Sequence, residues 1–385
     1  MPPAIREYWR QAPVREVATS NGGRAWLVTG MAEVRTVLSD PRFSRAEARR
    51  LRAGTDRAAV FDRPGLHDLD PPEHTRLRRL VQSAFSARRM RELRPRIEQI
   101  TGELLARLRD AGPPADLNAA LCFPLPVAVI CEILGVPQRD RERFRGWSRL
   151  ITSTDAYPRE QARAAREALT GYIAELVADK YRCPDGSLLH DLITARDQHG
   201  RLGQEDVVRL GFGLLIAAYE ATANMLGKGL VAMLDHPDQV AALRADLSSV
   251  PAAVEEVLRY VVLSIERDEG LILATTCAVE LGGVTIPAHA VVLASGAGAN
   301  LDPTAFAESD RFDLKRADAD SHVAFGYGPH YCLGAQLARM ELEVAYTGLL
   351  REFPGLRLAV PAGELSYTSG MLIHGLRALP VTWDA

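Results

Sequence analysis

Apolar residues recur along most of this chain with the three-to-four-residue spacing of amphipathic helices. Such runs cover residues 74–84, 87–111, 159–180, 204–236 and 251–262. Hydrophobic positions with this period favour helices that pack one face against a core. The pattern therefore predicts a mainly α protein.

Two segments have the pattern of strands instead. The stretch RAWLVTG at 24–30 alternates between apolar and polar residues, and VELGGVTIPAHAVVLAS at 279–295 is typical of a hairpin with a Gly-Gly turn. No repeat, low-complexity tract or linker divides the sequence. We expect a single domain over residues 1–385, mainly α with a small β region.

The longest apolar stretch, residues 210–234, contains Glu220 and Lys228. Because a charge at mid-bilayer is costly, this stretch predicts a core helix rather than a membrane span. The N-terminus, MPPAIREYWR, has no apolar segment, so we expect no signal peptide or membrane anchor. A cytoplasmic protein with no membrane partner is the resulting prediction.

Composition narrows the class further. The 385 residues are 47% hydrophobic and 25% charged, with a net charge of -3, which favours a large core and gives no general attraction to nucleic acid. The five cysteines are odd in number and scattered, so a disulfide framework is not expected. We expect four of them to be packing residues, namely Cys122, Cys131, Cys183 and Cys277.

The fifth cysteine, Cys332, lies in FGYGPHYCLG at 325–334. A helical pattern follows at once, so Cys332 stands at or just before a helix N-terminus, where unpaired amides and the dipole favour an anion. Glycines let the backbone approach a flat ring, and a thiolate ligand on haem iron favours O–O cleavage. The stretch therefore predicts oxygen activation; the alternative is a buried cysteine in a glycine-rich turn.

The spacing of Phe325, Gly328, His330, Cys332 and Gly334 resembles the signature of the cytochrome P-450 haem-thiolate monooxygenases. The resemblance extends from DPRFSR at 40–45 to LPVTW at 379–383. It implies the cytochrome P-450 fold, a triangular helical prism, and one haem (heme b) whose iron is ligated by Cys332. The residues that it places around the haem are His74, Arg78, Ala217, Phe325, Gly326, His330, Cys332 and Gly334.

His74 and Arg78 are four residues apart and so share one face of a helix. Two cationic donors suit the two haem propionates, although an exposed basic face would have the same spacing. The resemblance implies the propionate role. It also places Leu273 where the family usually has an arginine that reaches a propionate. Anchoring should then depend more on His74, Arg78 and His330, or on Arg267 as an alternative donor.

Glu256 and Arg259 are three apart, a spacing that permits an ion pair within a helix. In the family that this chain resembles, the pair joins a second arginine in a buried structural network. Here that arginine is Arg311 or Arg316.

The core helix contains the sequence AAYEAT at 217–222. Small residues there would leave room for O2 and substrate, although alanines also serve tight helix packing. The family has an acid followed by a threonine that help to deliver protons. Here the acid is Glu220, the threonine position is Ala221, and Thr222 is rotated by about 100° from it. These three are the predicted catalytic positions.

The resemblance is to the soluble bacterial class that includes macrolide and secondary-metabolite hydroxylases. It implies insertion of one atom of O2, by hydroxylation or epoxidation, into a hydrophobic, oxygen-bearing secondary metabolite such as a polyketide. A monomer served by a ferredoxin and ferredoxin reductase is implied as well. One alternative is oxidative coupling or ring formation, which would tolerate Ala221; another is a non-catalytic haem-binding or gas-sensing protein. The pocket is expected along residues 52–66, 263–271 and 369–372, with Ala217.

Overall fold

The computed structural model describes residues 12–19, 23–51, 62–82, 85–199, 203–263 and 271–384. Its contacts group into two compact units. The first unit comprises residues 1–55, 67–75 and 251–332, and the second comprises residues 56–66, 76–250 and 333–385. The expected single domain over residues 1–385 stays a prediction.

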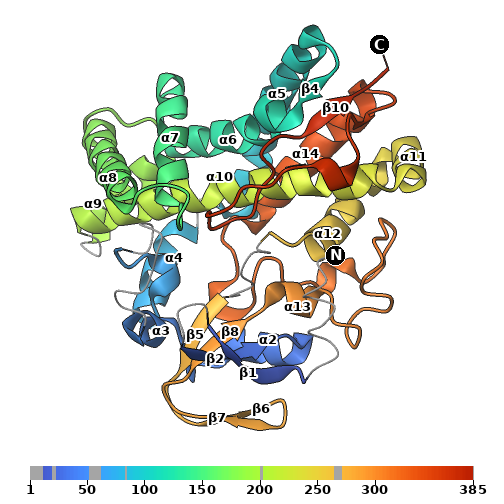
Figure 1. Ribbon diagram of the computed structural model, residues 1–385. Coiled ribbons are helices and arrows are strands. Elements are labelled where there is room, and N and C mark those ends of the chain that lie inside the picture. Colours follow the sequence, from blue (N-terminus) through green and yellow to red (C-terminus); the bar gives the residue numbers. More distant parts are fainter. Residues whose placement is uncertain are drawn as a thin grey trace. The chain divides into compact units, whose positions relative to one another are not determined.

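A five-stranded sheet forms the centre of the first unit (Figure 1). Its order is β1 (Val14–Ala18), β2 (Arg24–Val28), β8 (Val291–Ala294), β5 (Leu271–Thr275) and β3 (Phe43–Ser44). Strand β8 runs parallel to β2, with Val28 opposite Ala294, and the other pairs are antiparallel. The remaining elements of this unit are α2 (Met31–Ser39), α3 (Arg45–Leu51), β6 (Val279–Leu281), β7 (Val284–Ile286), α13 (Gly296–Asn300), most of α12 (Val250–Tyr260) and the short turns Ala319–Ser321 and Gly328–His330.

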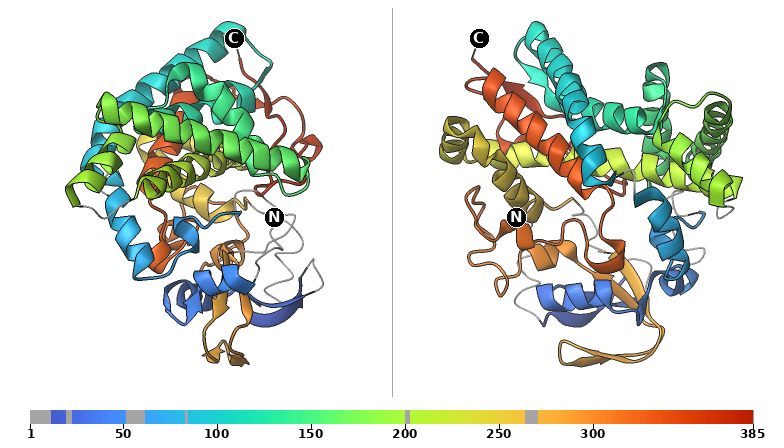
Figure 2. Two further views of the ribbon diagram at one scale, coloured as in Figure 1. Left: turned by 90° about the vertical axis from the view of Figure 1, so that its left-hand side faces the viewer. Right: turned by 180° about the vertical axis from the view of Figure 1, so that it is seen from behind.

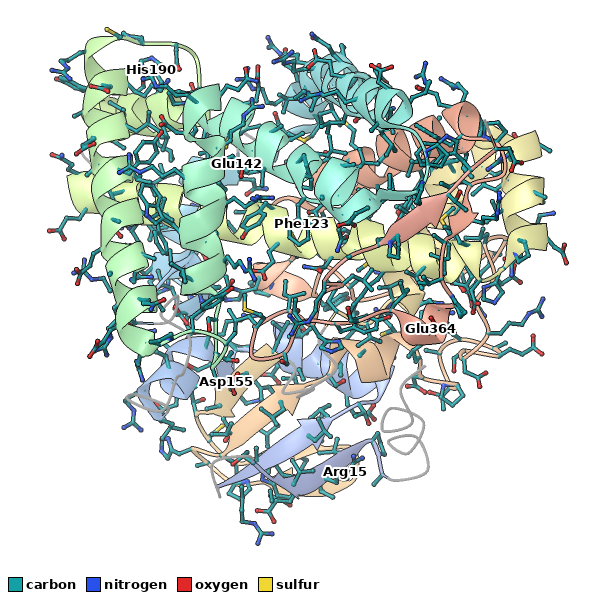
Figure 3. All side chains as sticks on the ribbon, turned by 45° about the horizontal axis from the view of Figure 1, so that its top comes forward. Arg15, Phe123, Glu142, Asp155, His190 and Glu364 are labelled. Atoms are coloured by element: carbon teal, nitrogen blue, oxygen red, sulfur yellow. The ribbon has the colours of Figure 1, made fainter. Side chains whose placement is uncertain are left out.

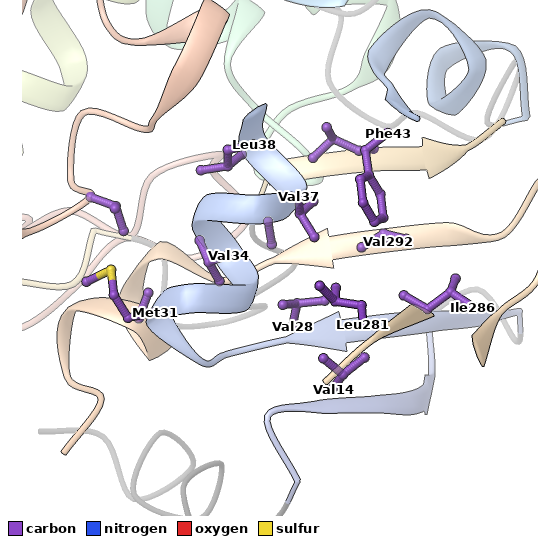
Figure 4. Packing of buried hydrophobic residues seen from close by; sticks show 14 of the residues in the cluster. Val14, Val28, Met31, Val34, Val37, Leu38, Phe43, Leu281, Ile286 and Val292 are labelled. Carbon is purple, nitrogen blue, oxygen red and sulfur yellow. The ribbon is translucent and has the colours of Figure 1, made fainter. Parts of the chain in front are cut away.

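Helix α2 closes the core of the first unit (Figure 4). Its apolar residues Met31, Val34 and Val37 recur every third position, so they fall on one face. This face packs on the sheet, where Val28 and Val292 are buried. Burial of apolar surface at about 25 cal/mol per Å² holds this layer together.

The second unit is built around the long helix α10 (Gln204–Leu234), which contacts helices on several sides (Figure 1). Seen from behind, α14 (Ala335–Glu352) lies beside α5 (Ala87–Ala111) (Figure 2). The Tyr346 hydroxyl of α14 donates to the Met225 and Leu226 carbonyl oxygens of α10, at 3.3 Å each. The other elements are α4 (Glu73–Gln82, which begins in the first unit), β4 (Ala115–Asp116), a π-helical turn (Asn118–Cys122), α6 (Pro124–Leu134), α7 (Arg141–Ile151), α8 (Arg159–Arg182), α9 (Leu188–His199), α11 (Pro237–Ala245), β9 (Arg357–Leu358) and β10 (Pro380–Thr382), with short 3-10 turns at Gln138–Asp140, Leu247–Ser249 and Ala362–Glu364. A further 3-10 turn, Leu66–Asp68, has its first residue in this unit and the other two in the first unit.

Several predicted elements are confirmed. Helix α5 has the predicted bounds because the Ser86 hydroxyl caps its first turn and Gly112 ends it with φ 73°. The predicted hairpin over residues 279–295 is confirmed for β6 and β7, which pair with each other. The last strand of that range, β8, pairs instead with β5 in the central sheet. Among the described residues, none of the helices has the length and apolar character needed to cross a bilayer.

All five cysteines are free, as expected. Cys122 and Cys131 are buried, which fits a packing role. The packing prediction is wrong for Cys183 and Cys277, which are exposed. Cys183 follows the last residue of α8, and Cys277 lies two residues after the end of β5.

Candidate functional site

The loop that carries Cys332 closes on itself by backbone hydrogen bonds. The Cys332 N–H donates to the Phe325 carbonyl oxygen at 2.9 Å, and the Tyr331 N–H donates to that of Gly328 at 3.0 Å. Cys332 is exposed and lies two residues before Gly334, the N-cap of α14. The chain thus presents the cysteine at the surface of the first unit just before a helix begins, as the sequence predicts.

Two glycines give this loop its form. Gly328 has φ 68°, and a Cβ there would lie 2.6 Å from the Leu38 carbonyl oxygen at the end of α2. Only glycine tolerates both that conformation and that approach. Gly326 has φ 73°, but a Cβ there would meet only the His330 carbonyl oxygen, at 3.9 Å. The loop is therefore held against α2 at Gly328 and open at Gly326.

The structure brings His74 and His330 together within the first unit. Their ring centroids lie 3.9 Å apart with a tilt of 31°. His74 is 1% exposed. Its backbone N–H donates to the Asp70 carbonyl oxygen at 2.9 Å, which fixes the residue in the first turn of α4. Arg78 follows one turn later on α4 and is partly exposed; it belongs to the second unit.

The Glu256 and Arg259 side chains form a two-pronged ion pair that is wholly buried. Arg259 Nε lies 2.6 Å from Glu256 Oε2, and Nη2 lies 2.8 Å from Oε1. Arg316 completes the network, with Nε 3.3 Å from Glu256 Oε2 and a side chain that is 9% exposed. The Arg311 side chain is outside it: 60% exposed, it pairs with Glu308, and only its carbonyl oxygen accepts from the two buried arginines. Of the two candidates, the structure places Arg316 in the network.

This network extends to the Cys332 loop through residues that have no sequence signature. Arg259 Nη1 donates to the Asn300 carbonyl oxygen at 2.9 Å, and Asn300 Oδ1 accepts from the Val323 N–H at 2.7 Å. His322, nearly buried, lies with Nε2 3.2 Å from Glu255 Oε2. The segment leading to Phe325 is thereby tied to α12.

Leu273 lies on β5 in the apolar core of the first unit and is 3% exposed. It shares this core with Leu38 of α2, whose carbonyl oxygen faces Gly328. An arginine at this position would have to find its partners inside that core. We therefore treat Leu273 as a packing residue, while the alternative donor Arg267 lies outside the described residues.

In the second unit, the middle of α10 has one uncovered face. Ala217 is exposed, and Ala218 and Ala221 are partly exposed, while most residues around them are buried. Thr222 does not share this face: it is largely buried, and its hydroxyl donates to the Ala218 carbonyl oxygen at 3.2 Å. The Thr222 hydroxyl therefore does not take the place of a hydroxyl at position 221, as the rotation of about 100° between the two residues predicts.

Glu220 is buried, unlike the alanines on either side of it on that face. Its side chain is 8% exposed, and burial raises the pKa of its carboxyl to about 7, against the opposing effect of a hydrogen bond to the Thr152 side chain. Thr152 follows the last residue of α7. The sequence gives no sign of this contact, because it depends on how α7 packs near α10.

Part of the expected pocket wall can be located. Residues 52–61 and 264–270 lie outside the described residues. In the second unit, Gly370 contacts the turn between α7 and α8, where Asp155 lies (Figure 3). A hollow of about 250 Å³ opens at this turn. Its lining is mostly polar: Ser153, Thr154, Asp155, Tyr157, Arg159 and Ala162.

These features fit a haem group. The cysteine is exposed, the loop is open at Gly326, and two imidazoles stand beside it as donors. In the described part of the chain, no group of three or more histidine, cysteine or acidic side chains could hold a metal ion.

Comparisons with known proteins agree with this geometry. Residues 137–356 match the profile of the family described as Cytochrome P450. Nocardicin C N-oxygenase of Nocardia uniformis subsp. tsuyamanensis is 43% identical, over 97% of this chain and 93% of that protein. Mycinamicin IV hydroxylase/epoxidase of Micromonospora griseorubida is 40% identical, over 96% and 92%. A solved cytochrome P450 hydroxylase from the leinamycin biosynthetic pathway of Streptomyces atroolivaceus S-140 has a TM-score of 0.91 at 43% identity, covering 100% of this chain and 96% of that one.

Proposed function

Because this chain belongs to the cytochrome P450 family and is a monooxygenase of that family, we propose that it inserts one atom of O2 into a hydrophobic, oxygen-bearing secondary metabolite. Haem-thiolate chemistry, once the cofactor is bound, supplies the activation of O2. The observation that carries the proposal is the exposed Cys332 in a loop held to α2 at Gly328 and open at Gly326.

We assign the cofactor contacts as follows. Cys332 would hold the iron of heme b as a thiolate, and His74, Arg78 and His330 would donate to its propionates. Charge-assisted hydrogen bonds of this kind are worth about 1.5–3 kcal/mol each. The residues that would lie along the ring are Phe325, Gly326, Gly334 and Ala217.

Glu220 would move protons. A carboxyl with a pKa of about 7 is partly protonated at neutral pH, so it can both give and regain a proton during one turnover. Ala221 would leave space on the uncovered face of α10. Thr222 has its hydroxyl bonded within the helix, so its part would be to shape that helix.

The proposed substrate class rests on two observations. Relatives act on natural products, including mycinamicin IV and nocardicin C by their names. The hollow beside the α7–α8 turn is lined by hydroxyls, a carboxylate and a guanidinium. Its volume of about 250 Å³ is below the roughly 300–1,000 Å³ of pockets for drug-sized ligands, so it would take only a polar appendage of a larger molecule.

Electrons would come from a ferredoxin and its reductase, and the protein would act as a cytoplasmic monomer. The test is turnover with a surrogate ferredoxin pair and isotopically labelled O2, using compounds that shift the haem absorption on binding. Monooxygenation predicts one labelled oxygen atom in the product. A protein that binds such compounds and is reduced, yet forms no product, would be a sensor.

Ala221 favours one second candidate, oxidative coupling or ring formation. That chemistry needs less proton delivery, so the missing hydroxyl would matter less. The same experiment separates the two, because a coupled product carries no labelled oxygen.

A further inference from the structure

The imidazole of His322 has a polar neighbour at each ring nitrogen. Its Nδ1 accepts from the Ala324 backbone N–H at 3.1 Å, and its Nε2 lies 3.2 Å from Glu255 Oε2 on α12. The His322 side chain is 2% exposed and that of Glu255 is 17% exposed. All three residues belong to the first unit, so the ring connects α12 with the segment that leads to Cys332.

These two contacts decide which ring nitrogen carries the hydrogen. A ring nitrogen that accepts from a backbone N–H has no hydrogen of its own, so the neutral imidazole of His322 carries its hydrogen on Nε2. That nitrogen is the one beside the Glu255 carboxylate. A hydrogen on Nδ1 would stand against the Ala324 N–H and take away its acceptor. The observed geometry therefore requires the neutral ring in this one tautomer.

The residues around Ala324 are held as well. The Val323 N–H donates to Asn300 Oδ1 at 2.7 Å, and the Gly326 N–H donates to the Val323 carbonyl oxygen at 2.8 Å. The contact with the His322 ring fixes the amide between these two. Phe325 is the residue that these bonds enclose, so together they set where its carbonyl oxygen lies.

The Phe325 carbonyl oxygen is the point at which the cysteine is attached. The Cys332 N–H donates to it at 2.9 Å. The rings of His322 and Phe325 also lie near each other, with centroids 5.9 Å apart and a tilt of 52°. A change at His322 would therefore reach the backbone of Cys332 through Phe325. Groups behind a metal ligand commonly orient it in this way.

We infer that His322 is a positioning residue for Cys332. The neutral imidazole, held beside Glu255, accepts from the Ala324 N–H. It thereby sets the Phe325 carbonyl oxygen, which in turn fixes the Cys332 N–H. The inference rests on the proposed role of Cys332 as the iron ligand. It concerns the placement of that ligand and adds no chemical step.

Three substitutions at position 322 separate the two ring nitrogens. His322→Asn keeps an oxygen that can accept from the N–H two residues further on, as in an Asx-turn. His322→Gln instead offers a longer amide toward Glu255, and His322→Leu removes both contacts. The matched control is His289→Asn, because His289 is an exposed histidine of the same unit that lies 2.8 Å from another glutamate, Glu47.

Hydrogen exchange of single backbone amides in the holoenzyme, resolved by fragmentation mass spectrometry, measures the effect. His322→Leu and His322→Gln should speed exchange at Ala324 and at Cys332 by roughly three- to tenfold, which corresponds to the loss of one net hydrogen bond. His322→Asn should stay close to the parent, and His289→Asn should change neither amide. The red-shifted band of the reduced carbon monoxide complex should also be lost faster in the Leu and Gln variants than in the parent and the Asn variant.

Unchanged exchange at Cys332 in His322→Leu overturns the inference. A His322→Asn protein that exchanges as fast as His322→Leu overturns it too, because the volume of the ring and not its acceptor would then matter. If His322→Leu does not retain full haem, the Gln and Asn variants are compared, and only Gln should speed exchange. Failure of the proposed ligand is a separate result: a parent protein without the red-shifted band would remove Cys332 from that role, while the exchange rates would still show whether His322 places its backbone.

Discussion

The imidazole rings of His74 and His330 lie 3.9 Å apart, which joins the first turn of α4 to the loop that carries Cys332. The two residues are distant in sequence and come from segments with different structure. Their contact puts two potential donors beside the candidate iron ligand within one unit. It gives the propionate assignment a geometric basis that the spacing of His74 and Arg78 alone does not supply.

Removal of the two propionate donors proposed on α4, His74 and Arg78, should weaken haem binding. On the proposed assignment, His74→Ala and Arg78→Ala should each lower the ratio of haem to protein, because each would remove a charge-assisted hydrogen bond worth about 1.5–3 kcal/mol. Arg79→Ala, an exposed arginine on the same helix, serves as the control and should keep full haem. Full occupancy in the His74→Ala, Arg78→Ala double variant would refute the assignment.

The buried network makes a sharper prediction about stability. Arg316→Ala removes one of the two arginines that pair with buried Glu256, which keeps Arg259, and should lower the free energy of unfolding by about 1.5–3 kcal/mol. Arg311→Ala is the matched control, because its exposed side chain pairs only with neighbours, and should cost less than about 0.5 kcal/mol. Urea denaturation at constant haem content measures both. Equal losses would place the two arginines in the same environment and contradict the structure.

Leu273 allows a test of the sheet core. Leu273→Arg would force a guanidinium among buried apolar side chains and should destabilise the protein by several kcal/mol, on the order of the cost of an unpaired buried charge. Leu273→Met conserves volume and should cost less than about 1.5 kcal/mol. The thermal unfolding midpoints of both variants, compared with that of the parent protein, measure this difference. A Leu273→Arg protein that is as stable as the parent and binds haem more fully would show that the side chain reaches a propionate.

Glu220 should make stability depend on pH. Its folded pKa of about 7 lies above the ordinary 4.5, so its contribution is fully present below pH 4.5 and is lost as pH rises to about 7. The total loss is on the order of 3 kcal/mol. Glu220→Gln has no such term, so its stability relative to the parent should rise through this window and level off above it. Denaturation at a series of pH values measures the difference; a difference that does not vary with pH means that Glu220 is ionised or solvated as in the unfolded chain.

Much of the helical framework could be predicted from periodicity. Helix α5 was bounded correctly because a serine cap and a glycine stop mark its ends. The sequence pattern places β8 in the same hairpin as β6 and β7. In the structure β8 pairs with β2 and β5 instead, which is a tertiary contact that no local pattern specifies. Local pattern identifies strands but does not choose their partners.

Some residues of the candidate site could likewise be predicted from the sequence, and others could not. Cys332 could be found because fixed glycines surround it, and the packing prediction failed for Cys183 and Cys277 because exposure of a lone cysteine has no local signal. Spacing could not choose between Arg311 and Arg316, since both follow α12 in an irregular segment. The burial that raises the pKa of Glu220 could not be predicted, because it depends on how the neighbouring helices pack around α10.

The central claim is that Cys332 is the thiolate ligand of a haem, and the spectrum of the reduced carbon monoxide complex tests it most directly. The parent protein should show the strongly red-shifted Soret band of thiolate ligation. Cys332→Ser should lose that band, while Cys277→Ser, which removes another exposed thiol of the same unit, should retain it. A red-shifted band that persists in Cys332→Ser would contradict the account.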